Sequence, residues 1–162
     1  MKRSLHITAA FSLVEITLAL GVAAFCLIAV MGMLPIGLKT QQAGVEQTKA
    51  NAIISAISTD LRAAVRLPPG LVSKQFGLKG YWGTVGTPDT LYFTNDVDQT
   101  PPNTVNVSPP PADAVLRATI SYLLPPTSTT SLADIKVTWP AQVDPATGVP
   151  TGSVETFIAI NR

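Results

Sequence analysis

The sequence contains little cysteine, histidine and charge. Among its 162 residues are one cysteine and one histidine, and 13% are charged, against about a quarter in ordinary globular domains. The single Cys26 has no partner for an intramolecular disulfide and lies inside an apolar run, where we expect it to pack as a small apolar residue. The net charge is +1, and the lysines and arginines are scattered rather than clustered. The sequence therefore predicts no nucleic-acid partner.

A long apolar run lies near the N-terminus. From Ile16 to Leu38 there are 23 residues without a formal charge, which as a helix span about 35 Å, enough for a hydrocarbon core of about 30 Å. Lys2 and Arg3 precede the run, and no lysine or arginine follows until Lys39, so the positive-inside rule places the N-terminus in the cytoplasm. The run exceeds the apolar region of a secretory signal, which is about 7 to 15 residues long. We therefore expect a single membrane-spanning helix.

One carboxylate, Glu15, stands at the start of this run, within "AAFSLVEITLAL" (residues 9–20). An ionised carboxylate at the centre of a membrane helix costs about 3 kcal/mol, and a plain anchor has no use for it. An intramembrane carboxylate is therefore a functional hypothesis, and Glu15 should have a positive partner. The alternative is that the Glu15 side chain only extends to the membrane interface.

The segment "FSLVEITLAL", which follows a short basic leader, resembles the N-terminal signature of type IV prepilins and of the pseudopilins of type II secretion systems. In that family a membrane prepilin peptidase cuts just before the Phe, the new amine is methylated, and the Glu five residues into the mature chain guides assembly. The resemblance implies cleavage between Ala10 and Phe11, N-methylation of Phe11, and an assembly role for Glu15. The residue before the cut is usually Gly, and Ala10 keeps a small side chain there.

The motif gives Glu15 a physical partner. Phe11 and Glu15 are four residues apart, so the new amine and the carboxylate can approach each other across one helical turn. In a filament of staggered subunits, Glu15 of one chain can instead reach the Phe11 amine of a neighbour. Such a pair is stronger in a low-dielectric bundle than in water, and it fixes the register of one helix against the next.

The resemblance also implies partners and a location. The partners are a prepilin peptidase, other pilin or pseudopilin subunits, the inner-membrane assembly machinery and membrane lipid. The chain would cross the inner membrane once, with a cytoplasmic N-terminus and a C-terminal domain in the periplasm or in an extracellular filament.

After the membrane run, residues 41–66 continue the predicted helix outward as an amphipathic segment that ends at "LPPG" (67–70). Its apolar stripe comprises Val45, Ile53, Ile54, Ile57, Leu61, Ala64 and Val65. The charged residues that we expect elsewhere on the helix surface are Glu46, Lys49, Asp60 and Arg62. Pro35, within the apolar run, should bend or locally loosen the helix.

Beyond residue 67 the composition changes to proline, threonine and short alternating runs. Strands are predicted at 90–94, 116–124, 135–139 and 153–160, with a turn at "DPATG" (144–148) before the last strand. The stretch "GYWGTVG" (80–86) indicates a flexible turn region. The predicted fold is α+β: a long N-terminal helix, transmembrane and then amphipathic, packed on a small C-terminal antiparallel β-sheet. This layout is similar to that of pilins.

The sequence thus divides into four parts. They are a leader peptide (1–10), a transmembrane and assembly helix (11–38), an amphipathic helix of the outer domain (39–66) and a Pro- and Thr-rich β-sheet region (67–162).

Enzymatic chemistry is not predicted for the processed chain. Removal of the leader takes away His6, the only histidine, and the only cysteine lies in the membrane run, so Ser/His/Asp, Cys/His and His- or Cys-dependent zinc chemistry are excluded. In "TNDVDQT" (94–100), Asn95, Asp96 and Asp98 offer oxygen ligands, and some pseudopilins bind calcium in such a loop. The remaining ligands of a calcium loop are missing, so a simple turn is favoured. No cofactor is predicted.

Two function classes follow. The favoured one is a pilin-like structural subunit, cleaved by prepilin peptidase and assembled into a type IV pilus or a type II secretion pseudopilus as a minor component. The alternative is a single-span anchored extracytoplasmic binding domain that never assembles. The tail "DIKVTWP…GSVETFIAINR" is similar to the ends of minor pseudopilins and of prepilin-like proteins from verrucomicrobial gene cassettes.

Overall fold

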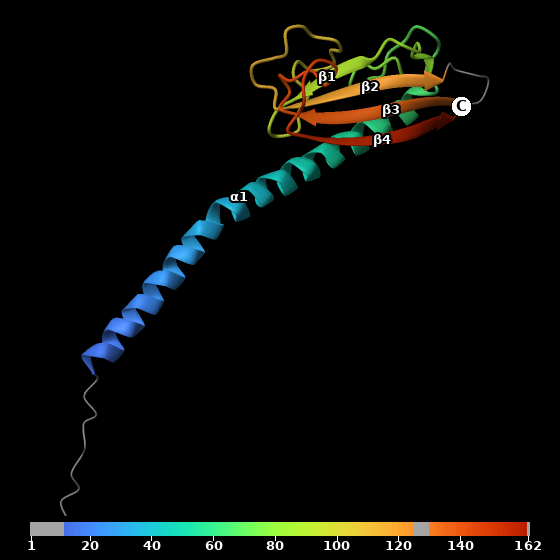
Figure 1. Cartoon of the computed structure of the whole chain (residues 1–162). Coiled ribbons are helices and arrows are strands. Elements are labelled where there is room, and N and C mark those ends of the chain that lie inside the picture. Colours follow the sequence, from blue (N-terminus) through green and yellow to red (C-terminus); the bar gives the residue numbers. More distant parts are fainter. Residues whose placement is uncertain (1–11, 125–129, 162) are drawn as a thin grey trace, which may run out of the picture. The chain divides into compact units, whose positions relative to one another are not determined.

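The computed structural model describes residues 12–124 and 130–161. Its elements, in chain order, are helix α1 (Leu13–Ala64), the short 3-10 helix η1 (Gly80–Trp82), and strands β1 (Asp89–Phe93), β2 (Leu116–Leu124), β3 (Thr130–Trp139) and β4 (Gly152–Asn161) (Figure 1). The chain forms two compact units, Met1–Gln42 and Ala43–Arg162, and each is described by itself. We call the second unit the head.

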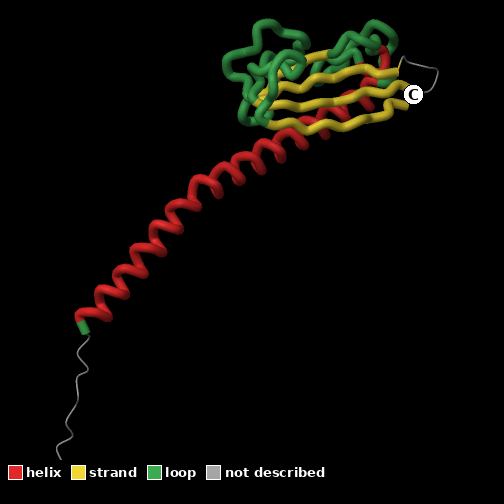
Figure 2. The backbone as a smooth tube through the Cα atoms, viewed as in Figure 1, coloured by secondary structure: helices red, strands yellow, loops and turns green. Residues whose placement is uncertain are grey.

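The head contains one four-stranded antiparallel sheet with the strands in the order of the chain, β1-β2-β3-β4 (Figure 2). The register places Ile120 of β2 beside Ile135 of β3, which in turn lies beside Thr156 of β4. Each strand pairs with the next strand along the chain, and such antiparallel neighbours need no crossover connection. The predicted α+β fold is confirmed.

All four predicted strands are present with ends within one residue of the prediction, except that β3 begins earlier than expected. β3 begins at Thr130 rather than at residue 135. The added residues, "TSLAD", include few strong strand formers, so their own sequence gives a weak strand signal. They become a strand because Ser131 and Ala133 are buried and the segment pairs with both β2 and β4. Tertiary pairing therefore extends the strand beyond its local preference.

The core of the head lies between α1 and one face of the sheet. On α1 the fully buried side chains are Ala50, Ile53, Ile57 and Leu61, which follow the spacing of one helix face. They pack in one cluster with alternating residues of the sheet: Leu91, Leu116, Ala118, Ile120, Ile135 and Val137. Burial of each large aliphatic side chain contributes about 1.5 to 3 kcal/mol, so this cluster is the main stabilising feature of the head.

Two residues of the amphipathic segment lie where the sequence pattern did not predict them. Val45 was expected in the apolar stripe but is 52% exposed, because the stripe that meets the sheet begins at Ala50. Asp60 was expected on the polar surface but is buried, with 6% exposure. Its Oδ2 accepts hydrogen bonds from the Ser73 hydroxyl and, at 3.3 Å, from the Phe76 N–H, which compensate for its burial.

The region 80–86 is also not the flexible turn that was predicted. Residues 80–82 form η1, and the Tyr81 side chain is fully buried in the core. The Gly83 backbone packs directly against the Tyr122 ring, so that a Cβ placed there would lie 2.4 Å from ring carbons. The glycine therefore permits a close contact between this segment and the sheet.

The loop between β1 and β2 covers part of the other face of the sheet. Tyr92 on that face is buried in a small cluster with Ala114 and Ala141.

The predicted turn at 144–148 is confirmed by a hydrogen bond from the Thr147 N–H to the Asp144 carbonyl at 3.0 Å.

Candidate functional site

The start of α1 positions Glu15. Ser12 precedes the first helical residue, and its carbonyl accepts hydrogen bonds from the Glu15 N–H at 3.0 Å and the Ile16 N–H at 3.2 Å. Ser12 thus occupies the N-cap position and Glu15 lies in the first turn, where the helix dipole favours a negative charge. The Glu15 side chain is exposed and makes no hydrogen bond within the described residues.

The spacing of Ser12 and Glu15 allows a capping role that the sequence analysis missed, although neither side chain forms a capping hydrogen bond within the described residues. Ser12 and Glu15 are three residues apart, the spacing of a capping box, in which a Glu at the third helical position reaches back to the backbone N–H of the cap. The signal was present in the sequence as "SLVE". A test of Glu15 should therefore separate its charge from a capping role, and Glu15→Gln does so because Gln can also complete a capping box.

The surface beside Glu15 is apolar and hollowed. Residues 12–45 are all exposed, and small side chains leave a depression of about 550 Å³ on the side of α1 lined by Glu15, Ile16, Ala19, Leu20 and Ala23. The carboxylate therefore borders a surface of mainly apolar side chains.

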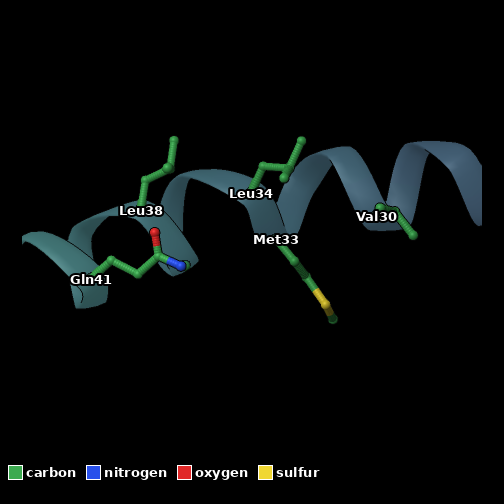
Figure 3. A pocket seen from close by; sticks show the side chains of 6 residues that line it. Val30, Met33, Leu34, Leu38 and Gln41 are labelled. Atoms are coloured by element: carbon green, nitrogen blue, oxygen red, sulfur yellow. The ribbon is translucent and has the colours of Figure 1, made fainter.

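A second depression, of about 300 Å³, lies further along the first unit around Gly37. Figure 3 shows Leu34 and Leu38 pointing to one side of the helix and Met33 to the other. Pro35 lies inside the continuous helix in this region, and the bend predicted there stays a prediction. Glycine here leaves space in which a neighbouring helix could approach closely.

Residues Leu13–Ala64 form one helix that is long and apolar enough, in its N-terminal part, to cross a membrane. The described residues thus fit a single-pass anchor in length and composition. The predicted cleavage site, Ala10 and Phe11, lies outside the described residues. Cleavage, N-methylation and the pairing of the Phe11 amine with Glu15 stay predictions.

The calcium candidates lie in a hydrogen-bonded turn. The Thr94 N–H donates to the Asp98 carbonyl at 2.9 Å, and the Val97 N–H donates to the Thr94 carbonyl at 3.1 Å. The Asn95 amide oxygen accepts a hydrogen bond from the Lys49 ammonium, and a neighbouring cation disfavours a metal ion. Asp96 and Asp98 are exposed on this turn. Within residues 12–124 and 130–161, no three or more His, Cys, Asp or Glu side chains gather as a metal-binding group.

A buried carboxylate elsewhere in the head is fully engaged in structural contacts. Asp89 has no exposure and accepts hydrogen bonds from the Tyr122 hydroxyl at 2.8 Å and the Lys79 N–H at 3.2 Å, and it pairs with the Lys79 ammonium at 3.4 Å. Burial, together with the Asp89 charge, raises the pKa of Tyr122 far above its ordinary value. These contacts join β1, β2 and the η1 region.

Comparisons with protein-family models, with curated proteins and with solved structures each find no match to this chain. The assignment of function therefore depends on the chain's own motif and geometry.

Proposed function

We propose that this chain is a pilin-like structural subunit that prepilin peptidase cleaves and that assembles into a type IV pilus or a type II secretion pseudopilus as a minor component. The observation that carries the proposal is the position of Glu15: an exposed carboxylate in the first turn of an otherwise apolar, membrane-length helix that continues into an α+β head. An anchor alone gives no reason for an intramembrane carboxylate.

The proposed mechanism joins the charge to assembly. Cleavage before Phe11 creates an ammonium group at the membrane end of the helix. In the filament this ammonium pairs with Glu15 of an adjacent subunit, and the two opposite charges fix the stagger between helices. The exposed apolar side chains around Ala19, Ala23 and Gly37 then pack against neighbouring helices, where small residues permit close approach.

The mature N-terminus tests the proposal. Mass spectrometry of the full chain purified from cells with an active prepilin peptidase should show loss of residues 1–10 and a methylated Phe11. Ala10→Gly should be cleaved at least as well, whereas Ala10→Leu should stay uncleaved because a bulky side chain blocks the peptidase site. An intact leader in the wild-type chain, or cleavage of all three variants alike, contradicts the proposal.

A further inference from the structure

The two edges of the head sheet differ. At the β1 edge, the backbone groups that point away from β2 form hydrogen bonds with the loop that follows β1. The Tyr92 carbonyl accepts a hydrogen bond from the Thr100 N–H at 2.9 Å, and the Thr90 carbonyl accepts one from the Asn106 N–H at 2.8 Å. The Thr90 N–H donates to the Asn106 side-chain oxygen at 2.8 Å. This edge is therefore closed to a further strand.

The β4 edge is open. β4 is ten residues long and pairs with β3 alone (Figure 2). Within the described residues, no backbone group of β4 on the side away from β3 forms a hydrogen bond. β4 has few of the features that usually protect an edge strand from pairing with another strand. Gly152–Asn161 contains no proline and only one charged residue, Glu155. Its Phe157 side chain is 60% exposed.

We infer that β4 is a strand-addition site, at which an extended segment of a different protein pairs with its free edge. This inference goes beyond the proposed function.

A second copy of this chain does not complement this edge. Its β1 edge is closed, which leaves antiparallel pairing of β4 with β4. β4 carries Glu155 and no Lys or Arg, so two copies would bring only negative charge to the shared edge. A strand of a different protein can supply the opposite charge.

The chemistry of the edge describes the partner strand. On the open face, Glu155 pairs with Lys136 at 3.1 Å, and Asp134 lies nearby, so one negative charge is in excess. A partner strand should therefore carry Lys or Arg opposite Glu155 and an apolar side chain opposite Phe157. On the inner face it should present small apolar residues beside Val154 and Ile158, which border the core.

The test uses the full chain in detergent micelles and a fluorescent octapeptide, VTVFVKVT, whose Phe and Lys fall opposite Phe157 and Glu155 in the antiparallel register. The peptide should bind, and hydrogen exchange should slow at least tenfold at alternate β4 amides, the pattern of strand pairing. Replacing the peptide Lys by Glu should weaken binding at least tenfold, and N-methylating its edge-facing amides should abolish binding.

Phe157→Lys should weaken peptide binding at least tenfold, while Leu71→Lys, a matched change at another exposed apolar residue (54% exposed), should not. Equal binding of the N-methylated peptide, or no change in β4 exchange at saturating peptide, overturns the inference whether or not the variants fold. A dimer of the wild-type chain that Phe157→Lys dissociates also overturns it, because the occupant is then a second copy. The state of the N-terminus affects none of these results, so the proposed function is tested separately.

Discussion

At the scale of single residues, Asp60 ties α1 to the chain that follows the helix. Its carboxylate accepts from the Ser73 hydroxyl and the Phe76 N–H in a buried setting. Asp60→Ala leaves both donors buried without partners and should lower the free energy of unfolding of the head by about 1 to 3 kcal/mol. Asp60→Asn keeps one acceptor and should lose less. Urea denaturation of the full chain in micelles measures both, with Asp96→Ala as the exposed control. Equal stability of Asp60→Ala and wild type would refute this role.

Two glycines should respond to alanine with opposite signs. At Gly83 a Cβ would lie 2.4 Å from the Tyr122 ring, which its hydrogen bond to Asp89 holds in place, so Gly83→Ala should destabilise the head by about 1 to 3 kcal/mol. At Gly44, inside α1, nothing lies within 4 Å, and Gly44→Ala should stabilise the helix by up to about 1 kcal/mol. Thermal unfolding monitored by circular dichroism compares them, and shifts of the same sign would contradict this account.

At the scale of elements, two carboxylates of the sheet region should give opposite pH dependence. Burial and the Glu155 charge raise the pKa of Asp134 on β3, so its ionisation costs stability at neutral pH and the cost disappears as pH falls below about 4. The Ala146 N–H, and then Arg117, lower the pKa of Asp144 in the β3–β4 turn, so its contribution is present above its ordinary pKa of 3.8 and is lost as pH falls.

Stability curves of Asn variants test this contrast. Asp134→Asn should stabilise the head at pH 7, and Asp144→Asn should destabilise it. The Asp134 difference should disappear as pH falls to about 4, whereas the Asp144 difference should be lost only as pH falls below 3.8. Differences that stay constant over this range would show that ionisation is not their cause.

The elements differ in how well local sequence predicts them. β2 was predicted to the residue, because the first seven residues of "LRATISYLL" alternate apolar and polar side chains, which lie alternately buried and half-buried in the strand. The first half of β3 was not, because its strand state depends on pairing with two neighbours rather than on its own residues. The burial of Asp60 and Tyr81 depends on the loop at 67–83 folding back onto α1, a contact that no periodicity within the helix reports.

At the scale of the whole molecule, the α+β layout followed from two periodicities, 3.6 residues in the helix and two in the strands. The candidate assembly site was also predicted from the sequence, since a carboxylate inside an apolar run can be recognised from the sequence alone. The free β4 edge could not be predicted, because which strand lies at an edge, and which edge a loop covers, is a property of the assembled sheet.

The central claim is that the Glu15 charge directs assembly, and the most direct measurement is the ratio of filament-associated to membrane-retained protein for wild type, Glu15→Gln and Glu15→Ala. Both variants should insert normally, since removing an intramembrane carboxylate lowers the cost of insertion. Both should lose most filament incorporation, because the Phe11 ammonium of the neighbour is left buried without its partner. If Glu15→Gln assembles as wild type while Glu15→Ala does not, the capping role rather than the charge matters. Wild-type ratios for both variants would contradict the pilin-like mechanism for this chain.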